Sequence, residues 1–387
     1  MPKGCAPGAA AATGRPLSNV RVLSRRIALA AATFCLLTSS TWAQSRTART
    51  PEALVKQGEA ALEAGRYRDA FDAFADAAQQ RPRDVSLYTA AAYSASMLGQ
   101  AADAQQWLER ALQIEPRYTQ ASILLGQVLY KQGRVKDAVD VLEAGVKYAP
   151  DNAAMARQLD EWRKDSQLQS RFYESRGAHF SVLFEGPADD VMARKVVDIL
   201  EQAYYRVGAA LMTYPSRTIT VLLYTQEQFR DVTRSPSWAG ALFDGRIKLP
   251  VGGALNQGDE LQRVVEHELV HAVVSTMAGP TVPTWLHEGL AMTLEAGGGA
   301  WTEPILARTS VRVPLSSLSR GFLGMNAEQA TLAYAESVFA VKRMVALRGM
   351  PAVVSLIQGL GRGSTFESAF QQSIFMRFED FETMVAR

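Results

Sequence analysis

The sequence predicts an α-helical repeat array followed by an α+β domain. Three observations support this fold class. Glycine, alanine and proline recur at a fixed interval between residues 51 and 152, strand-like alternation begins after Gly177, and long amphipathic segments follow that alternation. The length of 387 residues suits two domains, and 48% hydrophobic with 21% charged residues is an ordinary globular composition. The net charge of +2 is too small to favour nucleic acid as a partner.

Residues 1–43 are predicted to form a secretory signal peptide. A basic, turn-rich start precedes a short apolar run from Ile27 to Leu37, and "TWAQ" offers a cleavage site after Ala43. That run is too short to span a bilayer, although an uncleaved anchor stays open as the alternative. "SRRIAL" resembles a twin-arginine signal only weakly, because Ala28 stands where Phe is usual, so the Sec route is favoured. We expect a periplasmic or secreted protein with no membrane span in its mature chain.

Both cysteines of the chain, Cys5 and Cys35, fall within the predicted signal peptide. The mature chain would therefore contain no disulfide and no thiol nucleophile. Any metal site in it would have to use histidine, aspartate or glutamate as ligands.

Three repeats of 34 residues occupy residues 51–152. The repeated positions are Gly65, Gly99 and Gly133, then Ala70, Ala104 and Ala138, then Pro82, Pro116 and Pro150. In each unit the glycine suits a turn between two helices, the alanine allows close packing, and the proline ends the second helix. The pattern resembles the tetratricopeptide repeat. Residues 153–177 are predicted to be a solvated capping helix and linker. The array is either a groove for a peptide or protein partner or a packing element for the second domain.

The second domain is predicted to cover residues 178–387. "HFSVLFEG" and "RTITVLLYT" are typical of strands, and a long amphipathic helix lies between them. "AGALFDGRIKLPVGG" is typical of a strand or hairpin bounded by glycines. Further helices are expected at Asp259–Thr276, Pro283–Glu295 and Glu328–Leu347. A small sheet followed by helices is an α+β arrangement.

The candidate site lies in the apolar stretch "VVEHELVHAVV", Val264 to Val274. Charged groups in a buried helix are costly unless something compensates them. His267 and His271 are four residues apart, so they project from one helix face and can both bind one metal ion. Glu268 stands beside them, where it can take the proton of a water molecule. The alternative is a pair of core histidines with ordinary hydrogen bonds.

Seventeen residues after His271, Glu288 stands in "PTWLHEGLAMTLE", which resembles the "WLNEGFA…E" segment of the aminopeptidase N family and, more broadly, the gluzincin metallopeptidases. "HEL.HA" followed by "P.WL.EGLA" resembles bacterial peptidase MA-like domains, which are often fused to tetratricopeptide repeats. The resemblance implies a zincin-like fold that binds Zn²⁺. It also implies His267, His271 and Glu288 as the metal ligands and Glu268 as the general base.

Four further residues are candidates for supporting roles. Glu295 is a possible hydrogen-bond partner for a ligating histidine, or else a solvated acid at a helix end. Tyr334 is the candidate for stabilising the oxyanion, as a tyrosine or histidine of a later helix does in gluzincins, or else a core tyrosine. His287 stands where the aminopeptidases have Asn and is expected to be partly exposed or behind a ligand. His179 is expected to be structural.

The expected function is that of an exported zinc metallopeptidase that hydrolyses peptide bonds, with repeats that recruit a substrate or partner. The rival is a catalytically silent scaffold of an envelope assembly, and a non-peptide substrate stays open as a third possibility. The chain lacks the Gly-x-Met-x-Asn segment with which aminopeptidases hold a free amino terminus. "GALFDGRIKLP" occupies that place, and an edge strand there can pair with an extended peptide.

Overall fold

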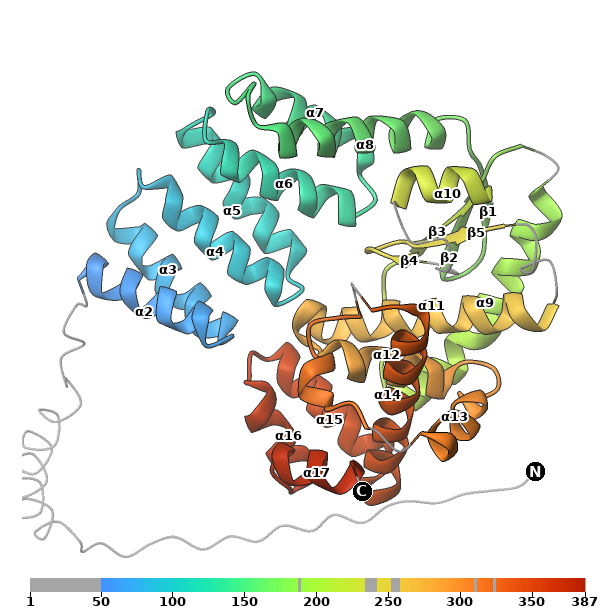
Figure 1. Cartoon of the computed structure of the whole chain (residues 1–387). Coiled ribbons are helices and arrows are strands. Elements are labelled where there is room, and N and C mark those ends of the chain that lie inside the picture. The colour runs from blue at the N-terminus through green and yellow to red at the C-terminus, as the bar shows by residue number, and fades with distance from the viewer. Residues whose placement is uncertain are drawn as a thin grey trace, which may run out of the picture. The chain divides into compact units, whose positions relative to one another are not determined.

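The computed structural model describes residues 50–186, 189–233, 242–251, 258–309, 312–322 and 325–386. The predicted signal peptide lies outside these residues. From Thr50 onward the chain forms one compact unit. In this unit a helical region precedes a mixed region with a small sheet (Figure 1). The predicted fold class, a helical repeat region followed by an α+β domain, is therefore confirmed.

The helical region begins with three helix pairs that follow the 34-residue spacing. Gly65, Gly99 and Gly133 separate the members of each pair at φ values of 68°, 72° and 80°, which glycine adopts without a steric cost. The three repeated alanines are fully buried. The pairs are α2 (Pro51–Glu63) with α3 (Tyr67–Gln80), α4 (Val85–Met97) with α5 (Ala101–Ile114), and α6 (Thr119–Lys131) with α7 (Val135–Val146).

The cap helix α8 (Ala153–Gln169) is less solvated than the sequence indicated. Asn152 caps it by accepting a hydrogen bond from the backbone N–H of Met155 at 3.0 Å. Trp162 and Asp165 on this helix are both buried. The strand β1 (Tyr173–Arg176) then follows inside the segment expected to be a linker. Its side chains are mostly exposed, and an exposed edge strand needs no apolar alternation, so the sequence carried no signal for it.

The sheet has five strands in the order β1-β2-β3-β5-β4. The three central strands are parallel, while β1 and β4 run antiparallel at the two edges. The long helix α9 (Asp190–Leu211) connects β2 to β3, and α10 (Gln226–Thr233) follows β3. The remaining strand bounds are β2 (Phe180–Phe184), β3 (Ile219–Tyr224), β4 (Leu242–Phe243) and β5 (Ile247–Pro250).

Both faces of the sheet are covered. Along β3, Val221 and Leu223 belong to the large core, whereas Leu222 and Tyr224 belong to a smaller cluster with Phe229 of α10. This alternation follows from the two-residue period of a strand. The helix α11 (Gly258–Ala278), which carries the candidate site, packs against α9 and against β4 and β5. Figure 1 shows α11 passing beneath the sheet.

The carboxy-terminal part is helical. The predicted helices at Asp259–Thr276, Pro283–Glu295 and Glu328–Leu347 correspond to α11, α12 and α14 within two residues at each end. The other bounds are η3 (Gly279–Thr281), α12 (Thr284–Leu294), η4 (Ala300–Thr302), α13 (Glu303–Arg308), η5 (Leu315–Leu318), α14 (Ala327–Arg348), α15 (Met350–Gly361), α16 (Phe366–Ile374) and α17 (Phe378–Val385).

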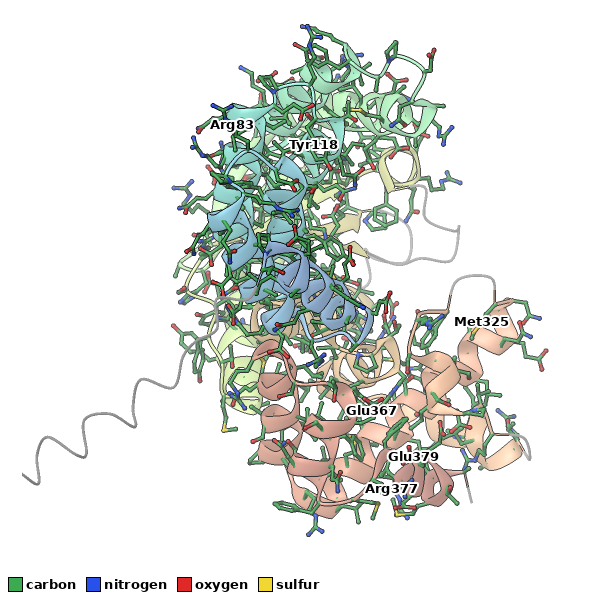
Figure 2. All side chains as sticks on the ribbon, turned by 90° about the vertical axis from the view of Figure 1, so that its left-hand side faces the viewer. Arg83, Tyr118, Met325, Glu367, Arg377 and Glu379 are labelled. Atoms are coloured by element: carbon green, nitrogen blue, oxygen red, sulfur yellow. The ribbon has the colours of Figure 1, made fainter. Side chains whose placement is uncertain are left out.

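This part of the chain carries charged side chains on its surface. Arg377 and Glu379, labelled in Figure 2, form an exposed ion pair at 3.0 Å. Among the described residues, no single helix is both long and apolar enough to cross a membrane. The helices α14 and α15 together pass that test by length and composition, but they meet at a bend of 111°.

Candidate metal centre

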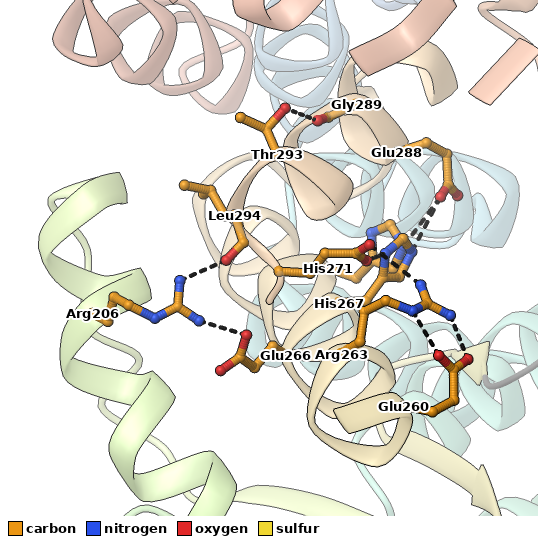
Figure 3. A network of polar contacts seen from close by, with 11 residues as sticks. Arg206, Glu260, Arg263, Glu266, His267, His271, Glu288, Gly289, Thr293 and Leu294 are labelled. Carbon is orange, nitrogen blue, oxygen red and sulfur yellow. Dashed lines mark hydrogen bonds and ion pairs between the residues drawn. The ribbon is translucent and has the colours of Figure 1, made fainter. Parts of the chain in front are cut away.

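The helix α11 holds its polar groups in place with an apolar face. Leu269, Val270 and Val273 are essentially fully buried in the main core. Their packing fixes the rotation of the helix and turns His267 and His271 toward α12. Figure 3 shows both imidazoles directed at the Glu288 carboxylate.

Three donor atoms converge at this point. Nε2 of His267 and Nε2 of His271 are 3.1 Å apart, and Oε2 of Glu288 lies 3.4 Å and 3.5 Å from them. An ion with three ligands at about 2.0–2.2 Å in tetrahedral geometry requires ligand atoms about 3.3–3.6 Å apart. The two distances from Glu288 fall in that range and the distance between the histidines is slightly shorter. Two imidazoles and a carboxylate are also a donor set that zinc accepts. The residues present therefore fit such an ion.

Behind His267 lies a chain of carboxylates and a guanidinium. Nδ1 of His267 donates to Oε2 of Glu295 at 2.7 Å, and Arg263 donates to Glu295 at 3.3 Å. Arg263 also donates to Glu260 at 2.6 Å (Figure 3). The Glu295 side chain is fully buried. Glu295 is therefore the histidine partner that the sequence suggested, and the alternative of a solvated acid is wrong. This bond fixes the tautomer that leaves Nε2 of His267 free to bind a metal.

Glu268 is suited to exchange protons. It is 6% exposed, and its Oε2 has no hydrogen-bond partner among the described residues. Burial raises the pKa of Glu268 and outweighs the opposing effect of His271 and His267. A ligand atom of Glu268 lies within 4.8 Å of those of both histidines. A carboxylate with a raised pKa beside a metal site can act as a general base.

The charges in the centre are strongly coupled. Burial alone would lower the pKa of His267, but Glu288 and Glu295 together raise it to about 10. Burial would also raise the pKa of Glu288, but His271 and His267 hold it well below its ordinary value. The carboxylates therefore attract a positive charge into this site, and a metal cation would take the place of the proton on His267.

His287 is partly exposed and lies against the ligand candidate His271, as the sequence indicated. Its ring stacks on that of His271, with centroids 4.4 Å apart and planes inclined by 12°. Burial, with a smaller contribution from His271, lowers the pKa of His287 to about 3, so its imidazole is neutral at pH 7. His179 is structural, as expected, because it donates to Glu201 at 2.7 Å and stacks on Tyr204.

Tyr334 on α14 lies near enough to the centre for the charges of its carboxylates to act on it. Burial raises its pKa, and the charges of Glu288 and Glu268 raise it further, so its hydroxyl remains protonated. Its ring also contacts Phe322 edge to face at 5.0 Å. A protonated hydroxyl near these carboxylates can donate a hydrogen bond, but its role as the oxyanion donor stays a prediction.

Sequence reasoning missed Arg263. Arg263 stands four residues before His267 and three after Glu260, so it lies on the helix face that carries the site. That spacing was the available signal. It could not show that Glu295, which is 32 residues away in the sequence, is the second carboxylate that Arg263 contacts.

Comparison with known families agrees with this architecture. Residues 200–384 match the peptidase MA superfamily, and residues 95–159 match the tetratricopeptide repeat. The first match contains all the residues of the candidate centre.

Two curated relatives match part of the chain. The chain is 28% identical over 138 residues to small glutamine-rich tetratricopeptide repeat-containing protein 2 of Mycosarcoma maydis, an alignment of 36% of this chain and 38% of that protein. It is 28% identical over 123 residues to the STIP1 homolog of Dictyostelium discoideum, covering 32% and 21%. The matched segments thus span well under half of these curated relatives.

Two solved structures resemble part of the chain. The first repeat domain of Spaghetti (RPAP3), bound to the HSP90 peptide SRMEEVD, matches with 19% identity and a TM-score of 0.30 over 31% of this chain and 98% of that one. The Arabidopsis OM64 repeat domain matches with 19% identity and a TM-score of 0.29, over 30% and 98%.

Proposed function

This chain joins a tetratricopeptide-repeat region to a peptidase MA superfamily domain, and on that premise we propose that it is a zinc-dependent metallopeptidase of gluzincin type. The observation that carries the proposal is the triangle formed by the donor atoms of His267, His271 and Glu288, with sides of 3.1, 3.4 and 3.5 Å. Its donor types and its two longer sides match three ligands of one zinc ion, and the side between the histidines is slightly shorter.

In the proposed hydrolysis of a peptide bond, each residue of the centre has a separate role. A zinc ion, when bound, supplies Lewis acidity that polarises a peptide carbonyl and acidifies water. His267, His271 and Glu288 would hold the ion, and Glu295 keeps His267 in the binding tautomer. Glu268 takes a proton from the attacking water and later delivers it to the leaving amine, which its raised pKa favours. Tyr334 donates to the oxygen on which negative charge develops.

Metal content of the purified chain from Gln44 onward tests the binding site. We expect near-stoichiometric zinc in the parent and a large loss in Glu288→Ala. Glu328→Ala is the matched control, because Glu328 is exposed at the start of α14. Absence of bound metal in the parent after zinc addition would contradict the proposal.

Hydrolysis is the second test. We expect the parent to cleave casein or members of a peptide library, and Glu268→Gln to retain zinc while losing activity. A parent that binds zinc but cleaves nothing in either assay would favour the scaffold instead.

Two wider parts of the proposal concern placement and partners. We propose that the protein is exported to the periplasm or secreted, on the basis of the signal-like residues 1–43, and that its repeats bind a protein substrate or partner. Detection of mature chain that starts near Gln44 outside the cytoplasm would support export. Full-length chain retained in the cytoplasm would contradict it.

A further inference from the structure

The hairpin formed by β4 and β5 lies against the third repeat. A Cβ atom built on Gly245, at the turn of this hairpin, would stand 2.4 Å from the carbonyl oxygen of Lys131 at the end of α6. A Cβ atom on Gly133, in the turn after α6, would stand 3.5 Å from the Arg246 side chain. The hairpin and this repeat are thus in backbone contact, and the contact admits no side chain at residue 245.

A buried hydrogen-bond network joins the two parts around Asp165 of α8. Asp165 accepts from the Tyr130 hydroxyl at 2.7 Å, the Tyr224 hydroxyl at 2.6 Å and Arg246 at 3.1 Å. Lys248 donates to the Tyr130 hydroxyl at 2.9 Å. The network therefore ties two helices of the array to β3 and β5 of the sheet.

The charges in this network are balanced. Asp165, Arg246 and Lys248 are each no more than 2% exposed, and Lys248 also pairs with Asp244 at 2.8 Å. The guanidinium of Arg246 lies 4.6 Å from the centre of the Tyr130 ring, which adds a cation–π contact. Two cations thus face two carboxylates. Apolar residues at these positions would stabilise the contact between the two domains at least as well. The buried charges are therefore better explained by a need to hold the hairpin and the third repeat in one fixed arrangement.

The hairpin has an edge that can bind a peptide. β4 is the last strand in the order of the sheet, so its outer edge has no partner strand among the described residues. An extended peptide can pair with such an edge through backbone hydrogen bonds. The helix α11, which carries His267 and His271, packs against both β4 and β5. A displaced hairpin would therefore shift a bound peptide relative to these histidines.

We propose that the third repeat and the cap helix hold the β4–β5 hairpin in the position where β4 pairs with an extended peptide substrate, and that Asp165 is the positioning residue. This inference rests on the proposed peptidase function. It gives the repeat array a part in the substrate cleft in addition to any partner that it binds elsewhere.

The test compares Asp165→Asn with Asp160→Asn, a control on the same helix whose side chain is 70% exposed. The probe is the casein peptide that the parent cleaves fastest. We expect Asp165→Asn to raise KM by about tenfold, equivalent to about 1.4 kcal/mol of binding. Its zinc content and kcat should stay within about twofold of the parent, because the metal ligands lie on other elements. Amide hydrogen exchange of Leu242–Pro250 should become faster.

Tyr130→Phe is the second variant, in case Asp165→Asn does not fold. It removes one hydroxyl of the network while keeping every charge and the stacking of residue 130 on Trp162. We expect a smaller rise in KM and faster exchange of the same hairpin. Unchanged hairpin exchange in both variants would overturn the inference, even in an active peptidase. So would faster exchange with an unchanged KM. A parent that neither binds zinc nor cleaves peptide would instead show that the proposed function itself has failed.

Discussion

At the scale of single residues, the positions of the two histidines depend on the side chains that contact them from the side away from the metal site. Glu295 orients His267, and Arg263 in turn holds Glu295. His271 differs, because its Nδ1 is buried with no hydrogen-bond partner among the described residues and its ring is supported by stacking on His287. The two histidines are therefore fixed by different forces, one by a hydrogen bond and one by packing.

Glu295→Gln tests the support of His267. The amide keeps the size of the side chain but accepts a weaker hydrogen bond from Nδ1 and leaves Arg263 with one carboxylate fewer. We expect zinc affinity to fall about 10–100-fold, as measured by competition with a chelator. Glu260→Gln is the control, since Glu260 also pairs with Arg263 but does not contact the histidine. Equal affinities in both variants would show that Glu295 has no influence on the metal.

Tyr334→Phe tests the predicted oxyanion donor. Removing one such donor typically lowers kcat by about 10²–10³-fold, while the metal stays bound because the hydroxyl is not a ligand. We expect this decrease in peptide hydrolysis with unchanged zinc content. Tyr205→Phe, on an exposed tyrosine of α9, should leave kcat unaltered. If Tyr334→Phe kept full activity, Tyr334 would be a core residue and not the oxyanion donor.

Most of this centre could be predicted from the sequence, because several of its residues lie close together along the chain. His267, Glu268 and His271 lie on one helix, where a spacing of four residues fixes which side chains share a face. Glu288 lies on the next helix, which a resemblance in sequence located, and Glu295 directly follows that helix. The stacking of His287 on His271 was not predictable, because it depends on how α11 and α12 cross.

At the scale of elements, the centre depends on how closely three helices approach. The helix α12 carries Glu288 and lies between α11 and α14. Gly289 permits this approach, because a Cβ atom there would stand 2.3 Å from the carbonyl oxygen of Ser337 in α14. The glycine next to a predicted ligand thus sets the distance between two helix backbones.

Gly289→Ala should therefore destabilise the fold. The added methyl group meets backbone, which cannot rotate away, so we expect a loss of about 1–3 kcal/mol in the free energy of unfolding by urea. Gly208→Ala is the control: the atoms nearest to its Cβ belong to the side chain of Tyr214, which is 50% exposed, and not to backbone. Equal stability of the two variants would contradict the close contact of α12 with α14.

At the scale of the whole molecule, buried charged residues connect the helical region to the sheet. This connection could not be predicted from the sequence. The repeats were predictable from their period, but Lys248 and Tyr130 are 118 positions apart and follow no common pattern. A buried lysine in a strand looks like a solvated one until its partner is known. The burial of Lys248 shows that the third repeat serves as a packing element, which was one of the two roles predicted for the array.

The acid sensitivity of this junction can be predicted from Asp165. Burial would raise its pKa, but Arg246 and Lys248 bring it below the ordinary value of 3.8. Its stabilising contribution is therefore fully present above that value and is lost as the pH falls through the lower pKa of the folded state. At pH 7 we expect Asp165→Asn to cost about 3–5 kcal/mol, because it leaves buried cations partly uncompensated.

In strong acid the parent also carries a neutral group at residue 165, so the two chains should converge in stability. Urea unfolding of both chains between pH 7 and pH 2, with Asp160→Asn beside them, measures the difference. A difference that stays constant down to the lowest pH would contradict a role for the Asp165 charge.

The contact of Gly245 with the end of α6 also limits where repeat units can be added to or removed from such an array. A repeat unit of different sequence inserted between the third pair and α8 would separate Asp165 from Tyr130 and remove the contact between the hairpin and α6. Units added before Pro51 would leave every contact of the hairpin unchanged. Variation in repeat number among proteins of this architecture is therefore expected at the amino-terminal side of the array, and engineered extensions belong there too.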